Sequence, residues 1–469
     1  MAIATQNPAT GETVRTFDAH TDAEVDERLE RAAVAFRAYR LTSFAERAGW
    51  MRAAADILDA EADQIAALMT LEMGKTFKAA KAEVGKCAKG CRYYADHAEE
   101  LLADEPADAG AVGAVQAYAR YQPIGPVLAI MPWNFPLWQA MRFAAPALMA
   151  GNVGLLKHAS NVPQTALFME DLFRRAGFPA DVFQTLLIGS GEVERVLRDE
   201  RVVAATLTGS TPAGRAVAGV AGDRLKHTVL ELGGSDPFLV LPSADLEKSA
   251  SVAVTARCQN NGQSCIAAKR FIVHEDVADE WERLFNDKMR ALVLGDPMDD
   301  GTDVGPLATQ GGQQDCVELV EDARAKGATI AVGGDVPDKP GWWYPPTVVS
   351  GITTDMRLYA EEVFGPVALV FRVPDLDAAI ALANDTEFGL SSNVWTSDEA
   401  EQDRCIRDLE AGQVFVNGMT VSFNELPFGG IKNSGTGREL SAHGIREFTN
   451  IKTVWVGEGM AAGAARKTE

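Results

Sequence analysis

The sequence is poor in the features that mark membrane proteins and nucleic-acid-binding proteins. No apolar run approaches the roughly 20 residues that are needed to cross a bilayer. Acidic residues outnumber basic ones by 66 to 44, and the formal net charge is −22. A chain with this balance offers no general positive field for a polyanion. We therefore expect neither a membrane nor a nucleic acid as a partner.

Cysteine is scarce as well, and its six copies are scattered over 469 residues, at positions 87, 91, 258, 265, 316 and 405. This spacing matches neither a disulfide scaffold nor a paired C-x-x-C zinc site. We therefore expect reduced thiols and no bound metal. The first residues show no basic segment followed by an apolar core, so no secretory leader is expected and a cytoplasmic location is predicted.

The length and the hydrophobic pattern predict an α/β protein of at least two domains, because 469 residues exceed what one core usually serves. Residues 22–102 show apolar positions at helical spacing. From about residue 124 onward, short apolar runs alternate with helical patterns, which predicts parallel sheets covered on both faces. Glycines and a proline at 232–237 suggest a boundary, and we expect a second alternating set from about Ala244.

Three residues have side chains suited to acyl chemistry. Cys265 ends the small polar stretch NNGQSC, Glu231 lies on an otherwise apolar strand, and Asn134 lies in a loop between two prolines. A thiolate adds to carbonyls, a buried carboxylate with a raised pKa can act as a base, and an amide donor can hold an oxyanion. Taken singly, Cys265 is better explained as a buried thiol and Asn134 as a turn asparagine, while Glu231 is equally well explained as a paired or solvent-facing carboxylate.

Two further segments indicate an anion site. TLTGSTP has the form of a strand followed by a helix start, with Gly209 and Ser210 at the turn, where free N–H groups can hold a phosphate. Lys157 ends another apolar strand, and Ser160 follows it in the next turn. In doubly wound sheets such positions commonly face a ligand. The alternatives are a capped turn without a ligand and a lysine that reaches solvent from a strand end.

The motifs together resemble the aldehyde dehydrogenase superfamily from Asn7 to Val456. They are MPWNFP, LLKHAS, TLTGST, LELGGSDP, NNGQSC, EEVFGPV, NDTEFGLS and PFGGIKNSGTGRE, in the order of the family. The resemblance implies that Cys265 is the nucleophile, Glu231 the general base and Asn134 the oxyanion donor. It also implies a cofactor site that consists of Trp133, Lys157, Ser160, Gly209, Ser210, Leu232, Glu362 and Phe364.

Within this superfamily the chain most resembles bacterial succinate-semialdehyde dehydrogenases, which implies oxidation of a small aldehyde through a thiohemiacetal and a thioester on Cys265. Ser160 stands where many NAD-preferring members carry a glutamate, so the cofactor is expected to be NAD or NADP. Arg142, Gln259 and Ser422 are the expected substrate-binding residues. Gln259 departs from the better-known branch, which has an arginine there. Another semialdehyde, or an aliphatic or aromatic aldehyde, is the alternative substrate.

The resemblance also implies two doubly wound domains and a small β extension that forms a homodimer or homotetramer. Residues 1–106 and 124–233 would bind the dinucleotide, residues 234–433 would carry the nucleophile, and 107–123 with 446–460 would form the extension. Two other classes of protein remain as hypotheses: a cysteine hydrolase or acyltransferase, and a non-catalytic member of the same family. A hydrolase would need no dinucleotide site, whereas a non-catalytic protein would not need Cys265.

Overall fold

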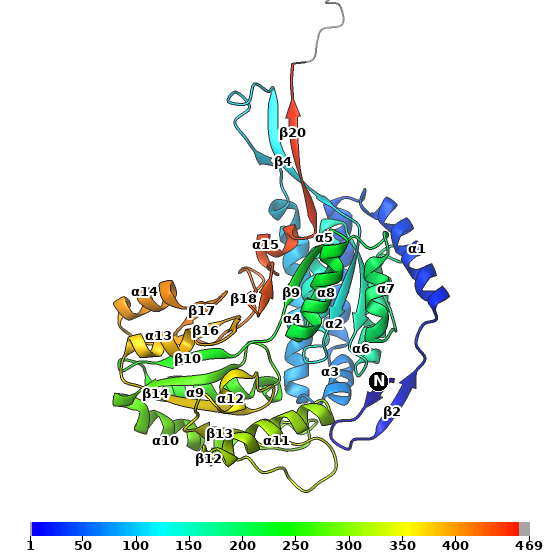
Figure 1. Ribbon diagram of the computed structural model, residues 1–469. Coiled ribbons are helices and arrows are strands. Elements are labelled where there is room, and N and C mark those ends of the chain that lie inside the picture. Colours follow the sequence, from blue (N-terminus) through cyan, green and yellow to red (C-terminus); the bar gives the residue numbers. More distant parts are fainter. Residues whose placement is uncertain (1, 459–469) are drawn as a thin grey trace, which may run out of the picture.

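Two sheets of mainly parallel strands form the two lobes of the molecule in the computed structural model, which describes residues 2–458 (Figure 1). The first sheet has the order β19-β9-β8-β5-β6-β7, and β19 alone is antiparallel to its neighbour. Its strands are β5 (Pro126–Met131), β6 (Val153–His158), β7 (Phe183–Thr185), β8 (Ala204–Thr208), β9 (His227–Glu231) and β19 (Gly435–Thr436). The helices between them are α5 (Trp138–Ala150), α6 (Pro163–Arg175), α7 (Val193–Arg198) and α8 (Thr211–Asp223).

The second sheet has the order β12-β13-β14-β11-β10-β16-β17, with β12 as its antiparallel edge. Its strands are β10 (Asp236–Val240), β11 (Ala268–His274), β12 (Thr329–Val332), β13 (Thr347–Ser350), β14 (Val367–Val373), β16 (Ser392–Trp395) and β17 (Val414–Val416). Its helices are α9 (Leu246–Cys258), α10 (Glu275–Ala291), α11 (Gln310–Ala325), α12 (Arg357–Ala360), α13 (Leu376–Asn384) and α14 (Glu399–Asp408). The expected α/β class with two doubly wound domains is thus confirmed.

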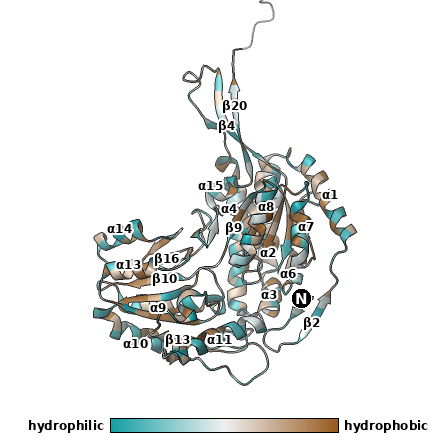
Figure 2. Ribbon diagram, in the orientation of Figure 1, coloured by the Kyte–Doolittle hydropathy of each residue, from teal (hydrophilic) through white to brown (hydrophobic). Residues whose placement is uncertain are grey.

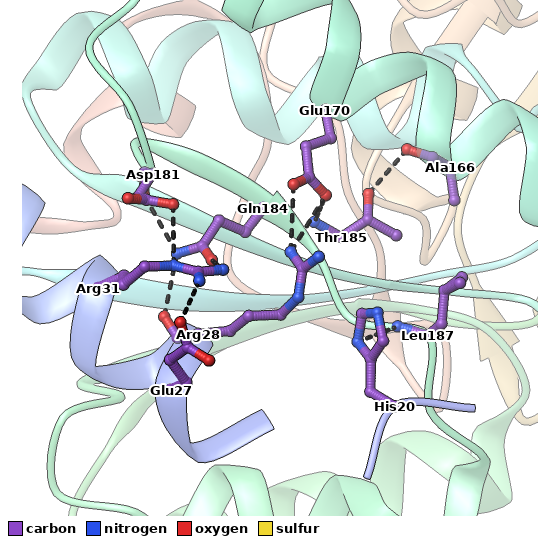
Figure 3. Close-up of polar contacts among 10 residues, drawn as sticks. All are labelled: His20, Glu27, Arg28, Arg31, Ala166, Glu170, Asp181, Gln184, Thr185 and Leu187. Atoms are coloured by element: carbon purple, nitrogen blue, oxygen red, sulfur yellow. Dashed lines mark hydrogen bonds and ion pairs between the residues drawn. The ribbon is translucent and has the colours of Figure 1, made fainter. Parts of the chain in front are cut away.

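The helical N-terminal region forms four helices, α1 (Asp22–Tyr39), α2 (Phe44–Ala60), α3 (Ala62–Met73) and α4 (Phe77–Leu101). Thr21 and Ser43 each close a capping box, which explains why α1 and α2 begin where they do. Figure 3 shows polar contacts between α1 and the β7 edge of the first sheet. Here Arg28 of α1 forms an ion pair with Glu170 at 3.1 Å. Glu170 also accepts a hydrogen bond from the backbone N–H of Thr185 at 2.7 Å.

A narrow antiparallel arm projects from the first lobe (Figure 1). It consists of β3 (Glu105–Pro106), β4 (Gln116–Pro123) and β20 (Thr449–Val456), and β20 pairs with β4 along all eight residues. The short helix α15 (Ser441–Arg446) leads into it. This arm contains the described part of the predicted β extension. Residues 459–460 of that prediction lie outside the described residues. Residue 1 of the predicted dinucleotide-binding domain lies outside them as well. The domain boundaries themselves stay a prediction.

One sequence expectation about the sheets is wrong. The second alternating set was expected from about Ala244, whereas the apolar run from Pro237 already belongs to it. The structure places β10 in the centre of the second sheet, between β11 and β16. The remaining short strands are β1 (Ile3–Gln6), β2 (Thr13–Phe17), β15 (Phe388–Gly389) and β18 (Ile431–Lys432).

Hydrophobic residues concentrate in the sheets and on the helix faces that cover them, while outer helices such as α10 and α14 are largely hydrophilic (Figure 2). The strands β5, β8 and β11 are buried along almost their whole length. This pattern is expected for parallel strands that are covered on both faces. Between residues 2 and 458, no helix combines the length and the apolar character needed to cross a membrane.

Candidate active site

Adjacent strands of the first sheet bring most of the predicted site residues together at the carboxyl ends of these strands. The strands β9, β8, β5 and β6 are neighbours, and they run parallel. Glu231 ends β9, Gly209 follows β8, Asn134 follows β5, and Ser160 follows β6. Ligands of open α/β sheets bind outside the carboxyl ends of the strands. The sheet topology therefore assembles a site from segments that are far apart in the sequence.

The loop that carries Cys265 has an unusual backbone. Asn260, Asn261 and Gly262 all adopt left-handed conformations, with φ of 55°, 57° and 74°. A Cβ atom on Gly262 would lie 2.4 Å from the carbonyl carbon of Gly365, so glycine is required there. The side chain of Asn261 donates hydrogen bonds to the carbonyl oxygens of Gly74 and Pro306, at 2.8 and 2.9 Å. The polar stretch before Cys265 is thus a rigid turn that fixes the position of the thiol.

Two cavities meet at Cys265. One has a volume of about 260 Å³ and is lined by predicted cofactor and catalytic residues, namely Trp133, Asn134, Gly209, Ser210, Leu232, Glu362 and Phe364. The other has a volume of about 230 Å³, and the three predicted substrate residues Arg142, Gln259 and Ser422 line it. Cys265 and Gln139 line both cavities. A thiol between two cavities can contact a small substrate from one side and a cofactor from the other.

The first cavity has features that fit a dinucleotide. Gly209 and Ser210 precede α8, and the side chain of Ser210 forms no capping hydrogen bond, so the helix start can hold an anion. The rings of Trp133 and Phe364 meet edge to face at 5.8 Å and form an aromatic wall. Glu362 supplies a carboxylate that is able to accept hydrogen bonds from ribose hydroxyls.

Lys157 and Ser160 lie at the end of β6 and in the turn that follows, and neither lines this cavity. Lys157 is buried, and desolvation lowers the pKa of its ammonium group. A buried ammonium without a carboxylate at hand gains most from an anionic or hydroxyl-rich ligand. Ser160 is half-buried, and its carbonyl oxygen accepts a hydrogen bond from the backbone N–H of Ala4 at 3.0 Å. No glutamate occupies its position.

Glu231 is 1% exposed, and neither of its carboxylate oxygens has a hydrogen-bond partner among the described residues. Burial raises its pKa to about 8, against the opposing effect of Arg142 and with the support of Glu439. Glu231 lines neither cavity and lies close to Gly429, where an added Cβ would be 2.8 Å from its Oε1. A carboxyl group of this kind is poised to exchange a proton near neutral pH.

Burial also raises the pKa of the Cys265 thiol to about 12, although Arg142 opposes the shift. The charge of Glu231 contributes to this rise in the pKa of Cys265. Asn134 lines the cofactor-side cavity together with Cys265, and its Nδ2 donates a hydrogen bond to the carbonyl oxygen of Gln263 at 3.1 Å. An amide nitrogen has two N–H groups, so a second donor is left for a ligand.

Arg142 lines the second cavity, but its guanidinium group already has partners in the protein. Its Nε forms a buried ion pair with Glu439 at 2.5 Å, and its Nη2 donates a hydrogen bond to the hydroxyl of Thr208 at 3.3 Å. The guanidinium also stacks over the ring of Phe428, with 4.4 Å between its central carbon and the ring centroid. The charge of Arg142 is therefore largely balanced within the protein.

Sequence reasoning did not single out Lys86 or Glu439. Lys86 lies on α4 and lines the second cavity, 336 residues before its hydrogen-bond partner Ser422. Glu439 belongs to the PFGGIKNSGTGRE motif, yet nothing in that motif indicates which cation it pairs with. A carboxylate in a glycine-rich segment beside the apolar Phe428 was the available signal that Glu439 is buried. For Lys86 the sequence offers no comparable signal, because it reads as one more lysine on an amphipathic helix.

Comparison with known proteins gives a consistent result. The profile of the aldehyde dehydrogenase family matches residues 1–454. The succinate-semialdehyde dehydrogenase [NADP(+)] 1 of Mycobacterium tuberculosis is 67% identical over 456 residues, which are 97% of this chain and 100% of that protein. The succinate-semialdehyde dehydrogenase [NADP(+)] of Mycobacterium avium is 65% identical over the full length of both chains. A crystal structure of the Streptococcus pyogenes succinic semialdehyde dehydrogenase with NADP+ superposes with a TM-score of 0.94 at 38% identity, over 97% of this chain and 100% of that one.

Proposed function

This chain belongs to the aldehyde dehydrogenase family, and we propose that it oxidises succinate semialdehyde to succinate with NADP+ as hydride acceptor. The observation that carries the proposal is the placement of Cys265 between a cavity lined by the predicted cofactor residues and a second cavity that contains cationic side chains. The 65–67% identity to proteins of this name over nearly the whole chain supports the choice of aldehyde. Another semialdehyde, or an uncharged aliphatic or aromatic aldehyde, is the alternative substrate.

Cys265 is the proposed nucleophile. Loss of its proton gives a thiolate, the sulfur bonds to the aldehyde carbon, and the carbonyl oxygen becomes an oxyanion. We propose that the free N–H of Asn134 Nδ2 stabilises this oxyanion, a contribution worth about 3–4 kcal/mol when the donor is preorganised. Because burial raises the pKa of Cys265 to about 12, the thiolate needs a nearby base and the positive charge of Arg142.

Glu231 is the proposed base. With a pKa raised to about 8 it accepts a proton from the thiol or, later, from water that attacks the thioester on Cys265. The water oxygen bonds to the acyl carbon, the carbon–sulfur bond breaks, and the thiolate and the carboxylic acid separate. Because Glu231 lines neither of the two cavities at Cys265, we propose that its side chain rotates toward Cys265 for this step.

The cofactor, when bound, accepts the hydride that leaves the former aldehyde carbon. We propose that Gly209 and Ser210 hold its pyrophosphate, that Glu362 and Lys157 hold its two riboses, and that Trp133, Leu232 and Phe364 line its nicotinamide end. A serine at position 160 brings no negative charge near a 2′-phosphate, which favours acceptance of NADP. NAD remains the alternative cofactor.

We also propose that the chain works as a homodimer or homotetramer that is joined through the β3-β4-β20 arm. The arm projects from the body and exposes apolar side chains, with Ile451 63% and Trp455 55% exposed (Figure 1). Exposed edges and apolar residues of this kind invite pairing. Light scattering of the wild-type chain and of Ile451→Asp tests this, and an unchanged mass in the variant would contradict it. A cytoplasmic location stays a prediction.

The function is tested by steady-state kinetics that cross NAD and NADP with succinate semialdehyde, glutarate semialdehyde and butanal. We expect the highest kcat/KM for succinate semialdehyde with NADP and no cofactor reduction by Cys265→Ala. Cys405→Ala, which changes a buried thiol of the second lobe, is the matched control and should retain activity. If butanal is turned over as well as succinate semialdehyde, the proposed substrate is wrong. If Cys265→Ala still reduces the cofactor, the proposed mechanism is wrong.

A further inference from the structure

The second cavity contains one cation whose charge is not balanced by a carboxylate. Its basic lining residues are Lys86 and Arg142, and its acidic lining residue is Glu83. Arg142 is paired with Glu439 in a contact that is almost completely buried. Lys86 forms no ion pair with any acidic side chain of the described residues. Its ammonium group instead contacts a hydroxyl group and an aromatic ring.

Glu83 does not neutralise Lys86, although the two residues lie on the same helix. The carboxylate of Glu83 forms a buried ion pair with Lys75. Its other oxygen accepts hydrogen bonds from the backbone N–H groups of Leu137 and Trp138, at 2.9 and 2.8 Å. These contacts fix Glu83 at the start of α5 and use its acceptor capacity there. A second anion would therefore have to come from a ligand.

Ser422 and Trp138 hold the ammonium group of Lys86 in place. The Nζ atom lies 2.6 Å from the Oγ atom of Ser422 and 4.4 Å from the centroid of the Trp138 ring. The same Oγ accepts a hydrogen bond from Trp138 Nε1 at 3.1 Å. With two donors already directed at its oxygen, the hydroxyl of Ser422 keeps its own hydrogen to donate. An ammonium group and a hydroxyl hydrogen together match the two oxygens of one carboxylate.

We propose that Lys86 and Ser422 bind the carboxylate of the aldehyde substrate, and that Lys86 selects a carboxylated aldehyde over an uncharged one. This inference rests on the proposed function, because it names the part of the substrate that these two residues recognise. It also supplies a cation to a cavity in which position 259 is a glutamine. Arg142 then serves chiefly to hold Glu439 and to tune Glu231.

The electrostatics of the site support this role. Desolvation first, and then the charge of Arg142, lower the pKa of Lys86 to about 8. A partly buried ammonium in this state gains stability when a carboxylate binds next to it, because the opposite charge favours its protonated form. The bound anion would thus replace the hydration that Lys86 lost on folding.

The test compares Lys86→Met, Lys86→Arg and the control Lys89→Met, using succinate semialdehyde and butanal with NADP. Lys89 is an exposed lysine on the same helix, so its replacement should leave both reactions at the wild-type level. In Lys86→Met we expect KM for succinate semialdehyde to rise about 10- to 100-fold, with kcat within about threefold. The kcat/KM for butanal should fall far less, and Lys86→Arg should recover part of the lost affinity.

An equal loss for both aldehydes in Lys86→Met would show a merely structural role and overturn the inference, as would an unchanged KM for succinate semialdehyde. Calorimetric titration of succinate separates this result from the proposed function. If the wild-type enzyme does not prefer succinate semialdehyde to butanal, the proposed function fails. The carboxylate site still stands if succinate binds the wild-type chain and not Lys86→Met, and it falls if the two bind succinate equally.

Discussion

The Nζ atom of Lys269 lies 3.0 Å from Oε1 of Glu362 and 2.9 Å from the carbonyl oxygen of Cys265. Lys269 is fully buried on β11, while Glu362 lines the cofactor-side cavity. One ammonium group therefore joins the loop of the proposed nucleophile to a residue of the proposed cofactor site. These contacts use the ammonium group of Lys269 within the protein.

Replacing Lys269 by methionine should destabilise the protein by about 2–4 kcal/mol, because it leaves a carboxylate and two carbonyl groups without their donor. The urea midpoint of unfolding measures the change, and an unchanged m-value shows that the comparison is valid. Lys78→Met removes an exposed ion pair with Asp303 and should cost less than about 1 kcal/mol. Equal midpoints for the two variants would contradict the bridging role.

The backbone of the Cys265 loop leads to a second prediction. Gly262→Ala should cost about 3 kcal/mol or more and sharply reduce activity, because φ is +74° and the new Cβ would meet the backbone of Gly365. Gly219→Ala is the control, since this exposed position in α8 has open space around it and alanine favours a helix. The two thermal midpoints should move in opposite directions, and a shift of the same sign in both would be evidence against this account.

Local segments could be predicted from the sequence, whereas contacts between distant segments could not. The run VGLLKH was expected as a strand and forms β6, because a short apolar run flanked by turn residues has few other solutions. The second set of strands begins with the run from Pro237, earlier than the expected start near Ala244. Strands that are buried on both faces look alike in either sheet, so periodicity alone does not assign them.

The same limit applies to the site. Asn134, Glu231 and Cys265 could be predicted as site residues because each belongs to a motif that is visible within a few residues. The ion pair of Arg142 with Glu439 joins α5 to a loop almost 300 residues later, and it leaves no periodic trace in the sequence. Only the three-dimensional structure shows which side chains pair across the fold. These pairs decide which cations are free to bind a substrate.

Ser160 gives a third prediction, about cofactor choice. Ser160→Glu should lower kcat/KM for NADP about 10- to 100-fold and change the value for NAD much less, because the new charge would repel a 2′-phosphate. Ser160→Gln has the same size without the charge and should retain most of the NADP activity. Steady-state kinetics with both cofactors provide the measurement. If the glutamine and glutamate variants lose NADP activity equally, size rather than charge is responsible and the electrostatic argument is wrong.

The pH dependence of turnover gives the last prediction, and its sign follows from the groups around Glu231. The proposed base must be deprotonated to accept a proton from water, so kcat should fall as the pH drops below about 8, wherever thioester hydrolysis limits turnover.

Glu439 raises the pKa of Glu231, and Arg142 lowers it. Glu439→Gln removes the first effect and releases Arg142 from its partner, so the acid limb should move to lower pH. Arg142→Met should move the limb to higher pH, and Glu231→Gln should abolish it while leaving a single burst of cofactor reduction. Profiles of kcat between pH 6 and 10 distinguish these outcomes, and a limb that stays in place in both Glu439→Gln and Arg142→Met would assign the titration to a group other than Glu231.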